Sequence, residues 1–92
     1  MTPAQELERG RLARLVLDNA VYIEAFAKVD AAILAKWRAS TDPAERERLH
    51  AKQQALHEAH CELRTCMQTG ELQAEQQRRN RASDDRVRAI RG

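Results

Sequence analysis

The middle of the chain carries one apolar stripe at helical spacing. Between residues 20 and 40, large apolar side chains follow one another at intervals of three or four residues, which places them on one face of an α-helix. The stripe contains every aromatic residue of the chain. We therefore predict a helix over 20–40 with a single apolar face. This face consists of Tyr22, Phe26, Val29, Ile33 and Trp37.

The next helix begins at the sharpest local signal in the sequence. Asp42 is a strong helix N-cap, Pro43 suits the first helical position, and Glu45 follows in the first turn. Beyond this start, leucines recur every seven residues. We predict a helix over 44–69 that ends at Gly70, with this glycine as a left-handed cap. The recurring leucines are Leu49, Leu56 and Leu63.

A further helix is predicted near the N-terminus, over 3–17. Thr2 and Gln5 have the residue types and the spacing of a capping box. The polar pair Asp18-Asn19 then interrupts the apolar pattern. Either the helix continues with a polar residue on its seam, or it stops and one of the pair caps a new helix, and we favour the break. The apolar stripe of this segment is Leu12, Leu15 and Val16.

The chain after Gly70 is helix-prone but has almost no apolar stripe. Its apolar residues are too sparse to build a core, so we predict a polar helical extension from residue 71. A basic, flexible tail over 78–92 follows, which frays or orders on a partner. The sparse apolar residues are Leu72, Ala74, Val87 and Ile90.

Together these elements predict an all-α protein built on an antiparallel helical hairpin. The loop between the helices 20–40 and 44–69 has about three residues, and so short a connection makes the two helices antiparallel neighbours. The segment 3–17 packs across this hairpin or continues its first arm. Residues 1–77 then form one helical domain. Two helices leave each apolar stripe half exposed, so a third helix or a second subunit must cover it.

Composition strengthens the expectation of a partner. The chain has 92 residues, of which 42% are apolar, and 16 of the apolar residues are alanines, which bury little surface. A chain of this length buries only roughly 60–65% of its unfolded surface. A lone monomer with so small a core would be marginally stable, and we therefore expect a homo-oligomer or a complex with another protein.

Metal and catalytic chemistry find little support in the pattern. His57, His60 and Cys61 have metal-ligand types, but they lie on one predicted helix, whereas zinc usually takes ligand pairs from separate elements. The sequence has no Gly-rich phosphate loop, no GxSxG motif and no HExxH motif. We assign no catalytic residue, no metal ligand and no cofactor, and we expect a protein that is not an enzyme.

The cysteines and the hydropathy bear on the compartment. Cys61 and Cys66 are five residues apart, so on a helix they point about 140° away from each other and cannot form a disulfide. Two free thiols indicate a reducing compartment or an intermolecular role, and we favour the reducing compartment. No apolar run approaches the ~18 residues of a membrane span, and no secretory signal is recognisable. We expect no membrane association.

Charge is distributed unevenly along the chain. The net charge is +2, with a mildly acidic body and a basic segment over 78–92. Arginines in that segment can neutralise phosphates, but no aromatic side chains interleave for base stacking, and Asp84 and Asp85 dilute the positive field. Three interpretations stay open: solvent-exposed surface, docking on an acidic protein, and weak nucleic-acid binding. The arginines are Arg78, Arg79, Arg81, Arg86, Arg88 and Arg91.

The apolar faces of the hairpin also have two interpretations. They form the core, or they form a groove for a partner chain, and the two merge if the partner is a second copy. Trp37 ends the stripe beside the turn, where it should pack against the start of the facing helix. The residues assigned to this core or interaction face are Tyr22, Phe26, Ile33, Trp37, Leu49, Leu56 and Leu63.

Residues 8–74 carry a wider pattern. A basic–leucine start leads to a polar break, an aromatic stretch, a tryptophan before the turn, a charged helix start and a threonine-glycine end. This outline resembles a group of small, poorly characterised all-helical proteins encoded in tailed-phage and prophage genomes. The chain departs from the group at Ala20, where a proline often follows the break. The matching parts are Leu15 to Asn19, Glu24-Ala25-Phe26, Trp37, Glu45 to Leu49, and Thr69-Gly70.

The resemblance implies a phage origin and a role in virion assembly or as a virion component. Our leading hypothesis is a structural or assembly protein, in the virion or the host cytoplasm, that docks on a larger phage protein. One alternative is a phage-encoded inhibitor that binds a host enzyme or defence complex. Another is a DNA-associated accessory protein that uses the arginine tail.

Overall fold

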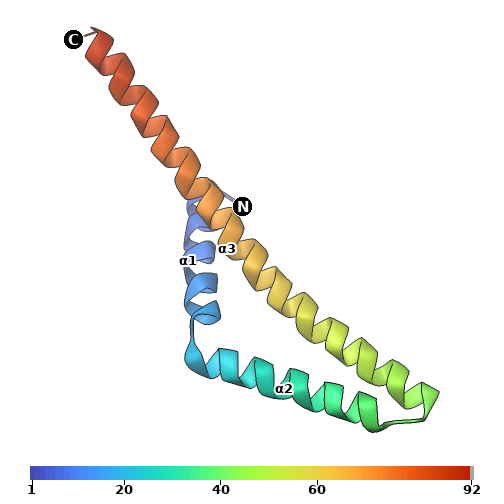
Figure 1. Ribbon diagram of the computed structural model, residues 1–92. Helices are drawn as coiled ribbons and strands as arrows, with labels where there is room; N and C mark the ends of the chain where they lie inside the picture. Colours follow the sequence, from blue (N-terminus) through green and yellow to red (C-terminus); the bar gives the residue numbers. More distant parts are fainter. Residues whose placement is uncertain (92) are drawn as a thin grey trace.

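Three α-helices account for almost the whole chain. A computed structural model describes residues 1–91, and the side chains of residues 1–90. The helices are α1 (Pro3–Leu17), α2 (Ala20–Ala39) and α3 (Pro43–Arg91), and the described residues include no strand (Figure 1). The predicted all-α class is therefore confirmed.

The predicted hairpin is formed by α2 and the first half of α3. The helices meet at the turn 40–42 and diverge with distance from it (Figure 1). Asp42 caps α3, because its Oδ1 accepts a hydrogen bond of 3.1 Å from the Ala44 N–H. Leu49 lies close to this turn, where the helices are nearest, and it is only 6% exposed.

The break after α1 is also present. The capping box at the start of α1 is complete, with Gln5 N–H donating to Thr2 Oγ1 at 3.2 Å and Thr2 N–H donating to Gln5 Oε1 at 2.9 Å. At the break, Asn19 Oδ1 accepts a hydrogen bond of 3.0 Å from the Tyr22 N–H. Asn19 is therefore the N-cap of α2, and the favoured alternative of a new helix is confirmed.

The predicted helix end at Gly70 is wrong. α3 is one helix of 49 residues that passes through Gly70 and ends at Arg91. Gly70 does not have the positive φ that a left-handed cap requires. Instead it is buried where α1 crosses α3, so a close approach of two helices explains this glycine.

The orientation of α1 differs from what its apolar stripe suggests. Gly10 and Ala13 face α3, and Ala13 is 6% exposed. Leu12, Leu15 and Val16 are 47%, 58% and 39% exposed, so the predicted apolar stripe stays largely open to solvent, whereas Leu7 and Leu17 are half-buried. The small side chains face α3 because they allow the two backbones to approach closely.

Residues 76–90 form a helical arm in place of a separate tail. They continue α3 beyond α1, and every one of them is exposed (Figure 1). A helix of 49 residues is about 74 Å long at 1.5 Å per residue, which matches the longest dimension of 75 Å. The radius of gyration is 20.8 Å, whereas a compact chain of this length has about 12 Å. Most of the molecule is therefore surface.

Candidate interaction surfaces

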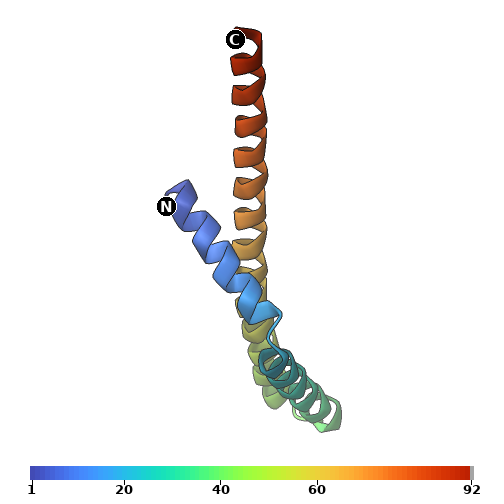
Figure 2. The same cartoon turned by 90° about the vertical axis from the view of Figure 1, so that its left-hand side faces the viewer.

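The crossing of α1 and α3 is the tightest contact of the fold. A Cβ on Gly10 would lie 2.7 Å from the Gly70 Cα and 3.0 Å from the Cys66 carbonyl oxygen. Figure 2 shows α1 tilted with respect to α3. Two polar contacts flank the crossing: an Arg14–Glu71 ion pair of 2.9 Å and a hydrogen bond of 2.8 Å from Gln73 Nε2 to Glu6 Oε2. The crossing fixes which side of α1 faces solvent.

That solvent-facing side is the first candidate surface. We call Leu12, Leu15 and Val16 the outer face of α1. This face continues into a side groove between α1 and α3, so apolar groups of both helices share one exposed surface. The groove is lined by Arg9, Leu12, Ala13, Val16, Leu63 and Cys66.

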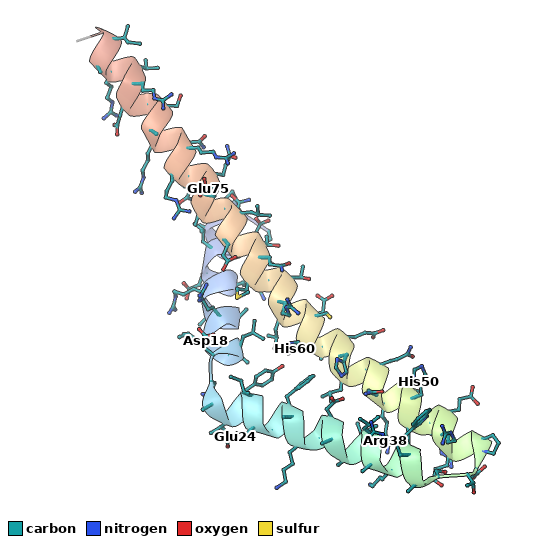
Figure 3. All side chains as sticks on the ribbon, in the orientation of Figure 1. Asp18, Glu24, Arg38, His50, His60 and Glu75 are labelled. Atoms are coloured by element: carbon teal, nitrogen blue, oxygen red, sulfur yellow. The ribbon has the colours of Figure 1, made fainter. Side chains whose placement is uncertain are left out.

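Aromatic and histidine side chains fill the space between α2 and α3. Tyr22 Oη and His60 Nδ1 share a hydrogen bond of 3.0 Å, and their rings are nearly parallel. The Phe26 ring centroid lies 4.8 Å from that of His60 and 5.2 Å from that of His57, which it meets edge to face. His60 lies on the part of α3 opposite the start of α2 (Figure 3). These contacts hold the diverging end of the hairpin together.

A polar contact lies beside this cluster. His57 Nε2 donates to Asp30 Oδ1 at 3.0 Å, and Gln53 Nε2 donates to the same oxygen at 3.2 Å. Hydrogen bonds from His57 and then from Gln53 hold the pKa of the Asp30 carboxyl below its ordinary value, because both stabilise the carboxylate. Asp30 therefore joins α2 to α3 as an anion.

Trp37 lies at the turn and is covered by an arginine. The Arg46 guanidinium carbon is 3.7 Å from the centroid of the Trp37 ring, a cation–π geometry. Arg46 Nη1 also donates to the carbonyl oxygens of Trp37 and Ser40, both at 2.9 Å. Trp37 thus contacts the start of α3, as expected, but it remains 37% exposed.

The other residues assigned to the hairpin face lie between the helices to different degrees. Only Leu49 among them is buried. The half-buried members are Tyr22, Phe26, Ile33, Leu56 and Leu63. These residues therefore lie toward the opposite helix, as predicted, but most of them stay partly exposed to solvent.

The arginines of the arm are all on the surface where the structure describes them. Arg78 and Arg79 pair with Glu75 at 2.6 and 3.3 Å, at the point where α3 leaves α1 (Figure 3). The hydrogen bond from Arg78 is the main cause that lowers the pKa of the Glu75 carboxyl. Arg81, Arg86 and Arg88 are exposed. The Arg91 side chain lies outside the described part of the chain.

The histidines and cysteines do not converge. Within the described residues, no group of three or more His, Cys, Asp or Glu side chains is placed to hold a metal ion. His57 and His60 are engaged with Asp30 and Tyr22 instead. Cys61 is an exposed free thiol, and Cys66 is a half-buried free thiol in the side groove.

The sequence pattern does not predict several of these contacts. The Gly10–Gly70 contact had a signal, since each glycine interrupts a helix-prone segment without other turn residues beside it. The Asp30–His57 pair and the arginine over Trp37 had none, because polar residues at such spacings are common on exposed helices. Whether such residues form a contact depends on which helices pack against each other.

The arrangement defines an elongated three-helix protein with one-sided apolar faces. Among the described residues, no helix is both long and apolar enough to cross a membrane. No protein-family model matches the chain, and neither curated proteins nor solved structures provided a match.

Proposed function

We propose that this protein is a non-enzymatic structural or assembly protein that acts through protein–protein contacts. The observation that carries this proposal is the outer face of α1. Three large aliphatic side chains, Leu12, Leu15 and Val16, are 39–58% exposed, while a glycine and an alanine are buried where α1 packs on α3. Contiguous exposed apolar groups of this kind mark protein interfaces, because leaving them in water is unfavourable.

The shape of the molecule supports the same proposal. The accessible surface is 7432 Å², whereas a compact monomer of this mass exposes about 5,400 Å². Ala13 and Leu49 are the buried apolar residues of the described chain. An elongated chain with so little interior offers its surface for contacts and gains stability when a partner covers it.

The resemblance of residues 8–74 to phage-encoded proteins supports a specific setting for this role. We place the protein in virion assembly or in the virion, docked on a larger phage protein. Mass spectrometry of purified immature and mature particles from the encoding phage or prophage tests this setting. We expect the chain in at least one of the two particle types, at a copy number comparable to that of a structural protein. Its absence from both, with the chain present in the infected cell, would contradict the setting.

The exposed arginines of the arm favour one second candidate, a DNA-associated accessory protein. Contacts with phosphates release counterions, so the logarithm of affinity falls with the logarithm of salt by about 0.9 per phosphate contact on duplex DNA. Titration of labelled duplex DNA at several salt concentrations measures this slope. A triple variant, Arg81→Gln, Arg86→Gln and Arg88→Gln, should reduce the slope by about 3 units if each arginine contacts one phosphate. An unchanged slope would show that these three arginines of the arm do not contact DNA phosphates.

A further inference from the structure

The outer face of α1 and the arm of α3 have complementary properties. The outer face and the side groove are largely apolar and lie beside the middle of α3, whereas the arm projects without any covering element (Figure 1). The arm ends with two apolar side chains one turn apart, Val87 at 45% exposure and Ile90 at 85%. The side groove presents Leu63 and Cys66 at the same spacing on α3.

Charge along α3 is also complementary between its two parts. Residues 58–75 contain four glutamates and one arginine, a net charge of −3. Glu71 and Glu75 already pair within the chain, so Glu58 and Glu62 are the glutamates of this part that no ion pair of the described residues engages. Residues 78–91 contain six arginines and two aspartates, a net charge of +4. Two copies of α3 aligned in parallel would place like charges beside each other, which is unfavourable. An antiparallel alignment places the basic arm of each copy beside the acidic part of the other.

We infer that a second copy of this chain covers the outer face of α1, with its arm lying antiparallel along the side groove and residues 58–75 of α3. A two-fold axis makes the contact reciprocal, so each copy donates an arm and receives one. The inference rests on the proposed protein–protein role, and it identifies a second copy of the chain as one partner.

One alignment satisfies the apolar and the polar groups together. When Ile90 of the second copy lies at the level of Leu63, its Val87 lies at the level of Cys66. The same alignment places its Asp84 at the level of Thr69, where Arg9 also borders α3. Arg88 of the second copy then lies within one turn of Glu62, close enough for a long side chain to reach.

The available area is sufficient for a stable dimer. The chain exposes roughly 2,000 Å² more than a compact monomer of its mass, and a standard interface buries about 800 Å² on each partner. Burying the outer face, the side groove and the apolar end of the arm therefore fits within the excess surface of each copy.

Disulfide cross-linking tests whether the arm of a second copy lies in the side groove and whether it runs antiparallel to α3. In the variant Cys61→Ser with Val87→Cys, the native Cys66 is the intended partner of residue 87 in the second copy. The matched control is Cys66→Ser with Val87→Cys, which leaves only Cys61, displaced by five residues and rotated by about 140°. A disulfide needs Cα atoms within about 7 Å. Under mild oxidation, we expect a covalent dimer with the first variant at least about ten-fold faster than with the control, since only the first pair meets this geometry.

Sedimentation equilibrium of the purified full-length chain measures the dissociation constant of the dimer and so tests whether the outer face of α1 is part of the interface. Leu12→Lys places a charge in the side groove and should weaken the dimer by about ten-fold or more, as expected for a central apolar contact. Val21→Lys, a control at an apolar side chain that is 72% exposed on α2, should leave the dimer intact. Circular dichroism verifies that both variants remain helical.

Two results would overturn the inference. A chain that stays monomeric at concentrations of tens of micromolar excludes the second copy. A dimer in which the Cys66–residue 87 pair forms no faster than the control pair excludes the antiparallel arm. The proposed assembly role is tested separately, by mass spectrometry of phage particles, so neither of these two results decides it.

Discussion

The Cα of Gly70 occupies the position that a side chain on Gly10 would need. A Cβ built on Gly10 lies 2.7 Å from that Cα, and a Cβ built on Gly70 lies 2.8 Å from the Gly10 Cα. Real Cβ atoms do not approach backbone atoms so closely, so each glycine requires the other. This single contact seats α1 on α3 and thereby turns the outer face of α1 to solvent.

Gly70→Ala should destabilise the protein although alanine is the better helix former. Alanine in a helix interior gains about 1 kcal/mol over glycine. At residue 70 the added methyl group meets the backbone of α1, and overpacking of this kind typically costs about 1–3 kcal/mol or more. Because the backbone cannot move as freely as a side-chain end, we expect a net loss of stability in urea unfolding.

The control for this variant is Ser83→Ala, which improves helix propensity on the exposed arm, where no helix packs against it. This substitution should be neutral or slightly stabilising, by about 0.5 kcal/mol. If Gly70→Ala were stabilising to the same degree, the close crossing of α1 and α3 would be refuted.

Trp37→Ala should cost roughly 1–2 kcal/mol, less than the 3–5 kcal/mol of a fully buried large aromatic residue. Trp37 is 37% exposed, and the Arg46 guanidinium lies over its ring. Trp37 is the only tryptophan, so its fluorescence reports this environment directly. Arg46→Ala should shift the emission to longer wavelength, whereas Arg48→Ala, an exposed arginine two residues away, should not. A loss of 3 kcal/mol or more for Trp37→Ala would indicate that another element or copy buries the ring.

The contribution of Asp30 to stability should disappear in acid. Its pKa is lower in the folded chain, since His57 and Gln53 stabilise the carboxylate. An unfolded aspartate has a pKa of about 3.9. The stabilisation is therefore complete above about pH 5 and is lost as the pH falls below about 4, through the folded pKa.

Asp30→Asn tests this dependence. The difference in unfolding free energy between wild type and variant should be largest near neutral pH and should shrink as the pH is lowered toward 3. Asp84→Asn on the exposed arm serves as the control and should show no such difference. A constant difference across the pH range would mean that Asp30 acts through packing and not through its charge.

Removal of residues 78–92 should leave the three-helix body folded. The described residues of this segment are exposed, and none of their hydrogen bonds reaches α1 or α2. Circular dichroism should lose only the helical signal of the removed turns, with an unchanged unfolding midpoint when both proteins are compared as monomers. A cooperative loss of the remaining helix would show that the arm packs into the body of the same chain.

Local chemistry in the sequence indicated where α1 and α3 begin and favoured, among two alternatives, a break at Asp18-Asn19 before α2. Thr2 with Gln5, Asn19, and Asp42 with Pro43 act within a few residues of the chain, so their caps can be recognised without knowing what packs nearby. The spacing of Tyr22, Phe26 and Ile33 likewise identified the side of α2 that faces α3, since all three are half-buried there, whereas Val29 of the same predicted stripe is 48% exposed.

Only the tertiary structure decided what the glycines and the α1 leucines do. Glycine is compatible with both a helix end and a close helix crossing, and the choice at Gly70 depends on Gly10, sixty positions away in the sequence. The apolar stripe of Leu12, Leu15 and Val16 is 39–58% exposed, because Gly10 and Ala13 take the positions of α1 that pack most closely on α3. Helix caps are local hydrogen bonds that a short segment contains entirely, whereas the packing of one helix on another depends on the shapes of both surfaces, which the sequence pattern of either helix alone does not contain.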